Sequence, residues 1–157
     1  MNRPITTYLR PEEVRSASVR LLHSHWSALC RGDSLPPKRA IDPAAIVPCL
    51  PYLTLAEIHR DPLRLRFRLV GTEIVQLRGG EFTWRWLEEL GWEAALVATL
   101  LARTADLIER RTPLFGLGDV VWHDGRRQVY EWAMLPFSED GTGVTHSLMM
   151  DDFRFAE

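Results

Sequence analysis

Glu57 and His59 are the pair of side chains best placed for acid–base chemistry. They lie two residues apart in a β-prone stretch, and residues with that spacing share one face of a strand. A carboxylate beside an imidazole can relay a proton or hold a ligand. His146 is the third polar candidate. These three residues define an enzyme hypothesis, in which an α+β fold would enclose them in a polar cavity.

The other titratable pairs have spacings that separate them. His23 and His25 lie about 200° apart around a helix, so they cannot bind one metal ion from the same face. Asp151 and Asp152 are adjacent in a strand pattern and point to opposite faces, so they cannot form a carboxylate dyad. We interpret the aspartates as solvated charges at a strand end and the histidines as structural or surface residues.

Sequence motifs for nucleophiles, phosphates and metals are missing. The chain has no Gly-x-Ser-x-Gly elbow, no P-loop and no paired CxxC. Gly116-Leu117-Gly118 gives half of a dinucleotide fingerprint, but no βαβ pattern surrounds it, and we expect a strand bulge there. Cys30 and Cys49 match no zinc spacing with the five histidines and are expected to be structural thiols. The sequence therefore disfavours an enzyme and predicts no metal.

Composition and charge exclude further classes. The 157 residues are 46% hydrophobic, which is enough for the core of one domain. The net charge is −2: residues 1–80 carry 12 basic and 7 acidic residues, and residues 81–157 carry 7 and 14, a balance without the basic footprint of nucleic-acid binding. No stretch approaches the roughly 20 apolar residues of a membrane span, and residues 1–10 lack the apolar stretch of a secretion signal. We predict a cytoplasmic protein.

Hydrophobic spacing predicts a long amphipathic helix at the amino terminus. In residues 10–30 apolar side chains recur at three- and four-residue spacings, Pro11 suits the first turn, and Gly32 suits the end. Five prolines then predict an irregular connector up to residue 51, with a short helix at 43–47. We divide the chain into residues 1–35, the helix and linker, and residues 36–157, the main domain.

The remaining patterns follow in an order that predicts an α+β fold. Residues 52–59 and 64–70 form a predicted hairpin. Helical segments are expected at residues 71–77, 83–90 and 92–111, the second capped by Thr83. Three more strands fit residues 114–153, with turns at 123–126 and 139–141. This order predicts a five-stranded antiparallel sheet with helices on one face and the long N-terminal helix beside it.

Several segments together resemble a known family: Pro37 to Pro43, Leu50-Pro51, Phe67 to Thr72, Gly80 to Thr83 and Glu131 to Phe137. From Trp26 to Asp152 the chain resembles a proteobacterial family of divergent PAS domains. One departure is Trp84, which stands where that family commonly has glycine. The resemblance implies a PAS-like fold and a non-enzymatic role as a sensor or interaction domain in bacterial signal transduction.

The resemblance also bears on cofactors. Haem-binding PAS domains commonly use a histidine on the long helix, and residues 92–111 contain none. Flavin photosensors of this type carry an adduct-forming cysteine beside the pocket, whereas Cys30 and Cys49 precede the first predicted strand. We therefore expect no cofactor.

An apolar cluster is the candidate ligand site. Its side chains could converge into a pocket between the sheet and the helices, or they could simply fill the core. The sequence leaves both interpretations open. The cluster consists of Phe67, Leu69, Phe82, Trp84, Trp86, Leu87, Trp132, Met134 and Met149.

Three hypotheses remain. The first is a sensor that binds a small apolar ligand or a protein partner and passes the change on through the N-terminal helix. The second is a homodimerisation module without a ligand, and the third is the small enzyme with Glu57, His59 and His146. None of them involves nucleic acid or a membrane. The predicted dimer seam consists of Leu21, Leu22, Trp26 and Leu29.

Overall fold

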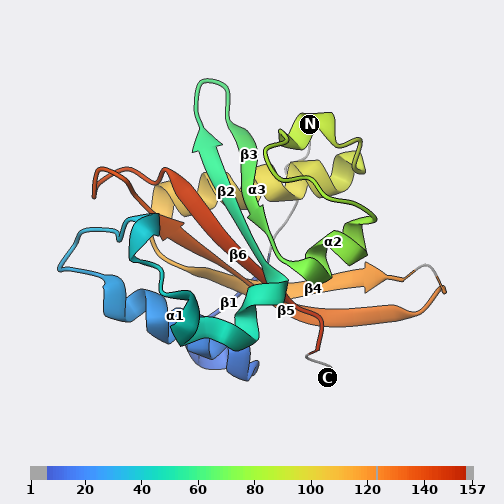
Figure 1. The fold of residues 1–157 in the computed structure, drawn as a ribbon, viewed down its shortest axis with the longest axis horizontal. Coiled ribbons are helices and arrows are strands. Elements are labelled where there is room, and N and C mark those ends of the chain that lie inside the picture. Colours follow the sequence, from blue (N-terminus) through green and yellow to red (C-terminus); the bar gives the residue numbers. More distant parts are fainter. Residues whose placement is uncertain (1–6, 123, 155–157) are drawn as a thin grey trace.

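The protein folds around one antiparallel β-sheet (Figure 1). The structure is a computed structural model that describes residues 7–122 and 124–154. Residues 1–6 of the predicted N-terminal segment and His123 of the predicted turn lie outside that range. Among the described residues, the sheet has six strands in the order β1-β4-β5-β6-β2-β3. They are β1 (Tyr8–Leu9), β2 (Leu53–His59), β3 (Arg64–Val70), β4 (Leu114–Val121), β5 (Arg127–Phe137) and β6 (His146–Asp152).

The predicted α+β class is confirmed, and the number of strands is corrected. The five predicted strands are β2 to β6, and β1 is an addition that pairs with Phe115 and Gly116 of β4. A two-residue strand carries too little periodicity to be recognised in a sequence. The strand adds a short sixth row to one edge of the sheet.

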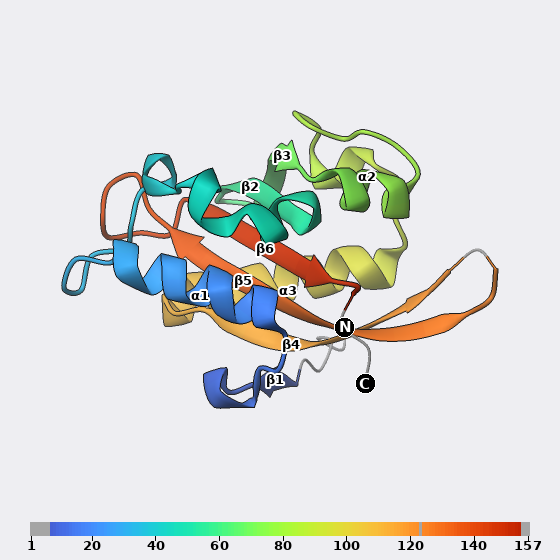
Figure 2. The same ribbon diagram turned by 60° about the horizontal axis from the view of Figure 1, so that its bottom comes forward.

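Helices cover both faces of the sheet (Figure 2). On one face, which we call the α1 face, lie α1 (Ala17–Leu29) and the 3-10 segment η3 (Pro43–Tyr52). On the other lie α2 (Thr72–Arg78) and α3 (Ala94–Arg110). The expectation of helices on one face is therefore corrected, because α1 folds back onto β5 and β6 of its own chain. The proposed boundary between residues 35 and 36 stays a prediction.

The start of α1 is fixed by a polar cap rather than by the first proline. Pro11–Glu13 form a separate 3-10 turn, η1, and α1 begins only at Ala17. The hydroxyl of Ser16 accepts a hydrogen bond from the amide of Val19 at 3.1 Å, which satisfies one of the donors that a helix start leaves unpaired. The predicted helix from residue 10 therefore starts seven residues too early.

The helices after β3 follow the prediction in part. The predicted segments 71–77 and 92–111 correspond to α2 and α3. The predicted helix 83–90 is reduced to the 3-10 turn η4 (Leu87–Glu89), and Thr83 caps no helix. The reason is Trp84, whose φ of +69° is left-handed and stops a right-handed helix at that point.

The glycines of β4 have a different role from the one predicted. Gly116 and Gly118 pair in regular register with Trp132 and Tyr130, so the expected bulge is absent there. A Cβ atom at either glycine would overlap the aromatic ring of the paired residue. The irregularity of the sheet lies instead between β2 and β3, where Arg68 is an extra residue in the register.

None of the helices in the described residues is both long enough and apolar enough to cross a lipid bilayer.

Candidate functional site

Two small cavities lie between the sheet and the helices α2 and α3. We call the space that contains them the compartment. Each cavity has a volume of about 30 Å³, enough for one or two water molecules. Arg78, Leu100, Met149 and Asp151 line both, so the two cavities meet at these side chains.

One cavity has mainly apolar walls. The rings of Phe67 and Phe82 meet edge to face with centroids 4.9 Å apart, and Phe82 meets Trp92 in the same way at 5.1 Å. Such edge-to-face pairs fix the rings in place. Ile74, from the buried side of α2, also lines this cavity. This part of the compartment suits an apolar group.

The other cavity is lined by polar groups from α3 and β5. The guanidinium carbon of Arg103 lies 3.9 Å from the centre of the Trp132 ring. Arg103 Nε and Trp132 Nε1 are both buried and have no hydrogen-bond partner in the described part of the chain. Buried donors are nearly always satisfied in folded proteins. Water or a ligand in this cavity can supply the missing acceptors.

Asp151 places a carboxylate where the two cavities meet. Burial raises its pKa, while Arg78 and Arg103 act in the opposite direction without outweighing it. No donor among residues 7–122 and 124–154 forms a hydrogen bond or a close ion pair with this carboxylate. Burial, followed by the nearby Asp151, also raises the pKa of Tyr130. Asp151 therefore has charged neighbours without direct partners.

The start of α1 lies against the opposite face of β5 and β6. In the β5–β6 register, Trp132 pairs with Asp151 and Glu131 pairs with Asp152. Successive strand residues face opposite sides, so Trp132 and Asp151 face the compartment while Glu131 and Asp152 face α1. We call these four residues the β5–β6 square.

The two carboxylates of the square that face α1 accept hydrogen bonds from the backbone and the capping residue at the start of that helix. Glu131, only 2% exposed, accepts hydrogen bonds from the amides of Arg15 at 2.9 Å and Ser16 at 3.0 Å. Asp152, 5% exposed, accepts one from the Ser16 hydroxyl at 2.5 Å. These bonds attach the beginning of α1 to the strands that line the compartment.

Six of the nine predicted pocket residues lie on the compartment side of the sheet. Phe67, Phe82, Trp132, Met134 and Met149 line the cavities, and Leu87 is buried in the same core.

The remaining three predicted pocket residues lie outside the cavities. Leu69 is 50% exposed, because the extra residue Arg68 reverses the side-chain alternation and turns Leu69 to the face opposite Phe67. Trp84 and Trp86 lie on the segment beside β3 and stack on arginines. Arg68 lies 4.4 Å from the Trp84 ring centre.

These tryptophans belong to a segment that covers the free edge of the sheet. The amide of Trp84 donates to the carbonyl of Phe67 at 2.6 Å, and the amide of Phe67 donates to the carbonyl of Arg85 at 3.0 Å. Arg64 lies 3.7 Å from the ring centre of Trp86. The segment therefore satisfies backbone groups that an edge strand would otherwise expose.

Sequence reasoning missed the polar half of the site. Asp151 and Asp152 do face opposite sides, as predicted, but Asp152 is buried and Asp151 is half-buried between the two cavities, so neither is a solvated charge at a strand end. Arg103 could have been found, because it lies between Leu100 and Leu107 on the apolar face of the predicted helix. A charged residue on that face indicates a polar element in the core.

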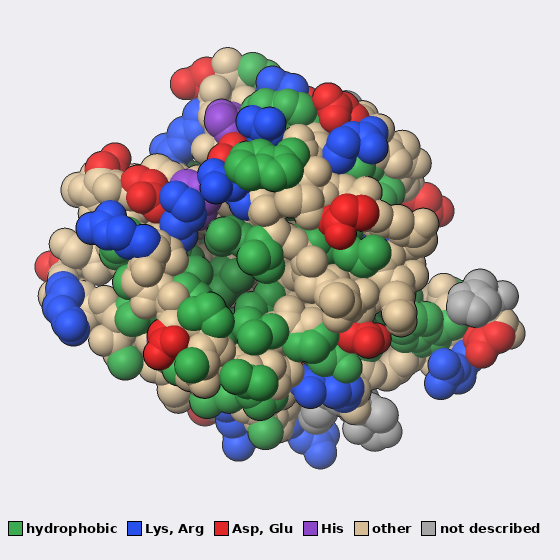
Figure 3. All heavy atoms as spheres, viewed as in Figure 1, with side chains coloured by type: hydrophobic (Ala, Val, Ile, Leu, Met, Phe, Trp, Pro, Cys, Tyr) green, Lys and Arg blue, Asp and Glu red, His purple; other side chains and the backbone are tan. Residues whose placement is uncertain are grey.

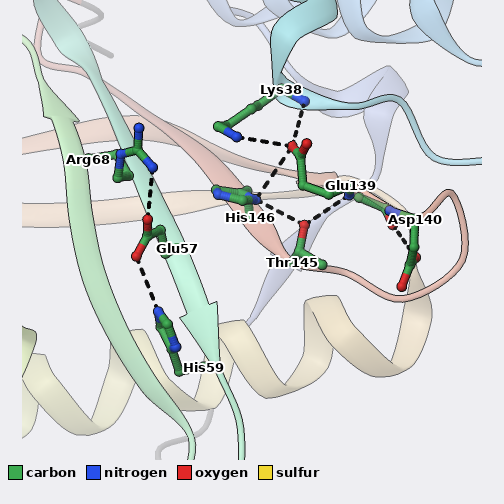
Figure 4. Close-up of polar contacts among 9 residues, drawn as sticks. Lys38, Glu57, His59, Arg68, Glu139, Asp140, Thr145 and His146 are labelled. Carbon is green, nitrogen blue, oxygen red and sulfur yellow. Dashed lines mark hydrogen bonds and ion pairs between the residues drawn. The ribbon is translucent and has the colours of Figure 1, made fainter.

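The three enzyme candidates lie together in an open groove on the α1 face (Figure 4). Figure 3 shows that this face is hollowed, with hydrophobic side chains around the hollow and cationic and histidine side chains at one rim. Glu57 accepts hydrogen bonds from Arg68 at 2.9 Å and His59 at 3.2 Å. Burial raises the pKa of Glu57, but these two bonds outweigh it and leave the pKa below its usual value. Glu57 is therefore a weak base.

His146 is not arranged for catalysis either. Its Nδ1 lies 2.9 Å from the hydroxyl of Thr145, and the Glu139 carboxylate lies 3.9 Å from that same nitrogen (Figure 4). A catalytic triad needs the hydroxyl and the carboxylate on opposite ring nitrogens. Burial, followed by Lys38, lowers the pKa of His146. The groove contains acid and imidazole groups without the geometry that joins them into a relay.

The predicted dimer seam is largely occupied within the chain. Leu22 is 1% exposed, and Trp26 is partly buried and donates its indole hydrogen to the carbonyl of Pro136 at 2.8 Å. Leu29 packs against the same core. Of the four seam residues, Leu21 is the exposed one, at 37%.

A larger hollow lies elsewhere, beside α2 and the ends of β4 and β6. It is an open cleft of about 580 Å³ whose lining includes Leu77, Trp122, Phe153 and Arg154. Two of its polar groups already have partners: Trp122 donates to Gln128 at 2.9 Å, and Arg154 donates to Asp152 at 3.2 Å. Among the described residues, the buried atoms Arg103 Nε and Trp132 Nε1, which have no hydrogen-bond partner, lie in the compartment, whereas Ser147 Oγ lines neither of its cavities. We take the compartment as the candidate site.

Comparison with known families supports the resemblance seen in the sequence. A family model described as a PAS domain matches residues 14–149, which is most of the chain. The chain belongs to the PAS domain family. The match includes Glu131 and Trp132 of the β5–β6 square, whereas Asp151 and Asp152 lie beyond its end at residue 149. No curated protein matches this PAS domain.

Solved structures similar to this PAS domain are distant. An RNA-binding light-oxygen-voltage receptor is 17% identical with a TM-score of 0.44, over 74% of this chain and 35% of the receptor. The PAS domain of an HTR-like protein from Haloarcula marismortui is 17% identical with a TM-score of 0.36, over 63% and 78%. The PAS domain of BvgS from Bordetella pertussis is 17% identical with a TM-score of 0.35, over 67% and 79%.

Proposed function

We propose that this PAS domain is a non-enzymatic sensor in which occupancy of the compartment changes how α1 is held. The β5–β6 square supports this proposal most directly. Trp132 and Asp151 face the cavities, and their direct neighbours Glu131 and Asp152 hold the amides and the cap of α1. A change of backbone position on one side of the square therefore acts on the other side.

A ligand shifts the conformational equilibrium of the protein only if it binds one conformation more tightly than another. The buried donors Arg103 Nε and Trp132 Nε1 gain acceptors when a ligand is present, whereas the bonds from Glu131 to Arg15 and Ser16 exist without it. A shift of β5 or β6 that improves the hydrogen bonds to the ligand therefore lengthens or shortens the hydrogen bonds that Glu131 accepts from the start of α1. We infer that α1 is the element which a protein partner in the cytoplasm would recognise.

Hydrogen–deuterium exchange tests the connection across the sheet. Glu131→Gln replaces the carboxylate with a neutral amide, which is a weaker hydrogen-bond acceptor for the start of α1. We therefore expect faster exchange at the amides of Arg15, Ser16 and Val19. In Trp132→Phe the change lies on the compartment side, and the same three amides should change.

A matched control separates the connection from general destabilisation. Asp119→Asn removes an exposed carboxylate from β4, which bonds to Arg127, and should leave the α1 amides unchanged. If Trp132→Phe also leaves them unchanged while the protein stays folded, the two faces are independent and the proposed sensor mechanism is wrong.

A further inference from the structure

The compartment has a polar end and an apolar end. Arg103, Tyr130 and Trp132 line the polar cavity, while the aromatic rings of Phe67 and Phe82 line the apolar one. The shared side chains join the two ends over a short distance. A molecule that satisfies both needs a polar head and a short apolar tail.

The polar end has more donors than acceptors. Two guanidinium groups, Arg78 and Arg103, line it against the single carboxylate of Asp151. Trp132, 2% exposed, adds an indole donor that has no acceptor in the described residues. Within a protein such an excess of positive charge is poorly solvated, and an anion corrects it. The head group is therefore an acceptor with one negative charge.

We propose that the compartment binds one small monocarboxylic acid with a short hydrophobic tail. The carboxylate lies in the polar cavity with Arg103 and Trp132 as donors, and the tail lies among Phe67, Phe82 and Trp92. This inference rests on the proposed function, because it names the ligand class of the same site.

The size of the compartment limits the length of the acid. Each cavity measures about 30 Å³, which is less than the volume of even a short acid, so butyrate fits only with small movements of the side chains between the cavities, and a long chain requires separation of α2 from α3.

Binding is tested with three probes that have the same tail and different heads: butyrate, butyramide and butylamine. NMR signals of the Trp92 and Trp132 indole hydrogens report on the two cavities, with Trp132→Phe to assign one of them. We expect butyrate to shift both signals and butyramide to bind at least about tenfold more weakly. Equal binding of the amide, or stronger binding of the amine, overturns the proposal.

Variants of α3 show whether Arg103 holds the carboxylate. Arg103→Met should weaken butyrate binding at least about tenfold, and Arg103→Lys, which keeps the charge and most of the stem, should weaken it to a smaller extent. The matched control is Arg110→Met, because Arg110 also stacks on an aromatic ring, Tyr8, at 4.9 Å but lies outside the compartment. Unchanged binding in both Arg103 variants overturns the assignment.

The ligand class and the sensor mechanism fail in different ways. If acids from acetate to hexanoate shift neither indole signal, the compartment holds water only and the ligand class is wrong, while the α1 exchange experiment still decides the mechanism. If butyrate shifts both signals and leaves exchange at Ser16 unchanged, the ligand class holds and the mechanism is wrong.

Discussion

Trp84 combines an unfavourable backbone with favourable side-chain contacts. Its φ of +69° lies in the left-handed region, which costs a residue other than glycine about 1–2 kcal/mol. Glycine, which the family resemblance implies at this position, would adopt this φ without that cost. The ring lies 4.4 Å from the guanidinium of Arg68 and 5.1 Å from that of Arg66, and such contacts contribute about 0.5–1 kcal/mol each at exposed sites. The stacking therefore offsets most of the strain.

Substitution of Trp84 separates the two effects. Trp84→Gly loses the stacking and the strain together, so its free energy of unfolding should lie within about 1 kcal/mol of the wild type. Trp84→Ala loses the stacking and keeps the strain, and should be less stable than Trp84→Gly by about 1 kcal/mol. Urea denaturation of the three proteins measures this. A Trp84→Ala protein as stable as Trp84→Gly would contradict the account.

Asp151 makes the stability of the protein depend on pH. Burial raises its pKa above the usual 3.8, so the folded state binds the proton more tightly than the unfolded state. Stability is then highest at low pH for this group and is lost as the pH rises from about 4 through the folded pKa. We expect Asp151→Asn, which cannot ionise, to gain stability relative to the wild type between pH 4 and pH 7. A constant difference over this range in denaturation curves would exclude the effect.

At the scale of elements, the strongest periodic patterns are the ones that predict the structure. The strands β2 to β6 and the helices α2 and α3 follow patterns of five residues or more. The prediction fails where one residue decides the backbone. The left-handed φ of Trp84 prevents the helix that was predicted for residues 83–90. Arg68 shifts the register of β3, so that Leu69 lies on the face opposite Phe67. Neither event leaves a trace in hydrophobic spacing.

The pairing of β4 with β5 depends on the absence of two side chains. A Cβ atom at position 116 would overlap the Trp132 ring. We expect Gly116→Ala to lower the free energy of unfolding by about 1–3 kcal/mol, as other overpacked cores do. Gly80→Ala is the control, because a Cβ there meets nothing within 4 Å, and it should be as stable as the wild type or slightly more so. Equal stability of the two variants would contradict this packing.

For the whole molecule, the sequence predicted the apolar half of the candidate site better than the polar half. Buried aromatic residues such as Phe82 and Trp132 are recognisable because large apolar side chains are usually inside. Charged residues that line the compartment, such as Arg103 and Asp151, depend on which helix covers which face. That arrangement was predicted incorrectly for α1, so Asp152 was also taken as solvated. The polar site follows from the arrangement in space rather than from local pattern.

The assembly of two molecules remains a separate prediction. With Leu22 in the core, a homodimer through α1 would use the exposed Leu21, together with Val47 of η3, which is 59% exposed. We expect sedimentation velocity to show a dimer that Leu21→Glu dissociates. Ser27→Glu adds the same charge about 120° around α1 and should leave the dimer intact. Monomers at all concentrations of the wild type would exclude a dimer seam on α1.

The two glycine–aromatic pairs of β4 and β5 also constrain how this chain can evolve. At positions 116 and 118 any larger residue collides with the ring opposite, and a smaller residue at 132 or 130 leaves a hole over the glycine. Neither partner can change first without loss, so the substitutions have to occur together or through a less stable intermediate. Descendants of this sequence should therefore keep glycine and aromatic as linked pairs, and relatives that lack one member should lack the other.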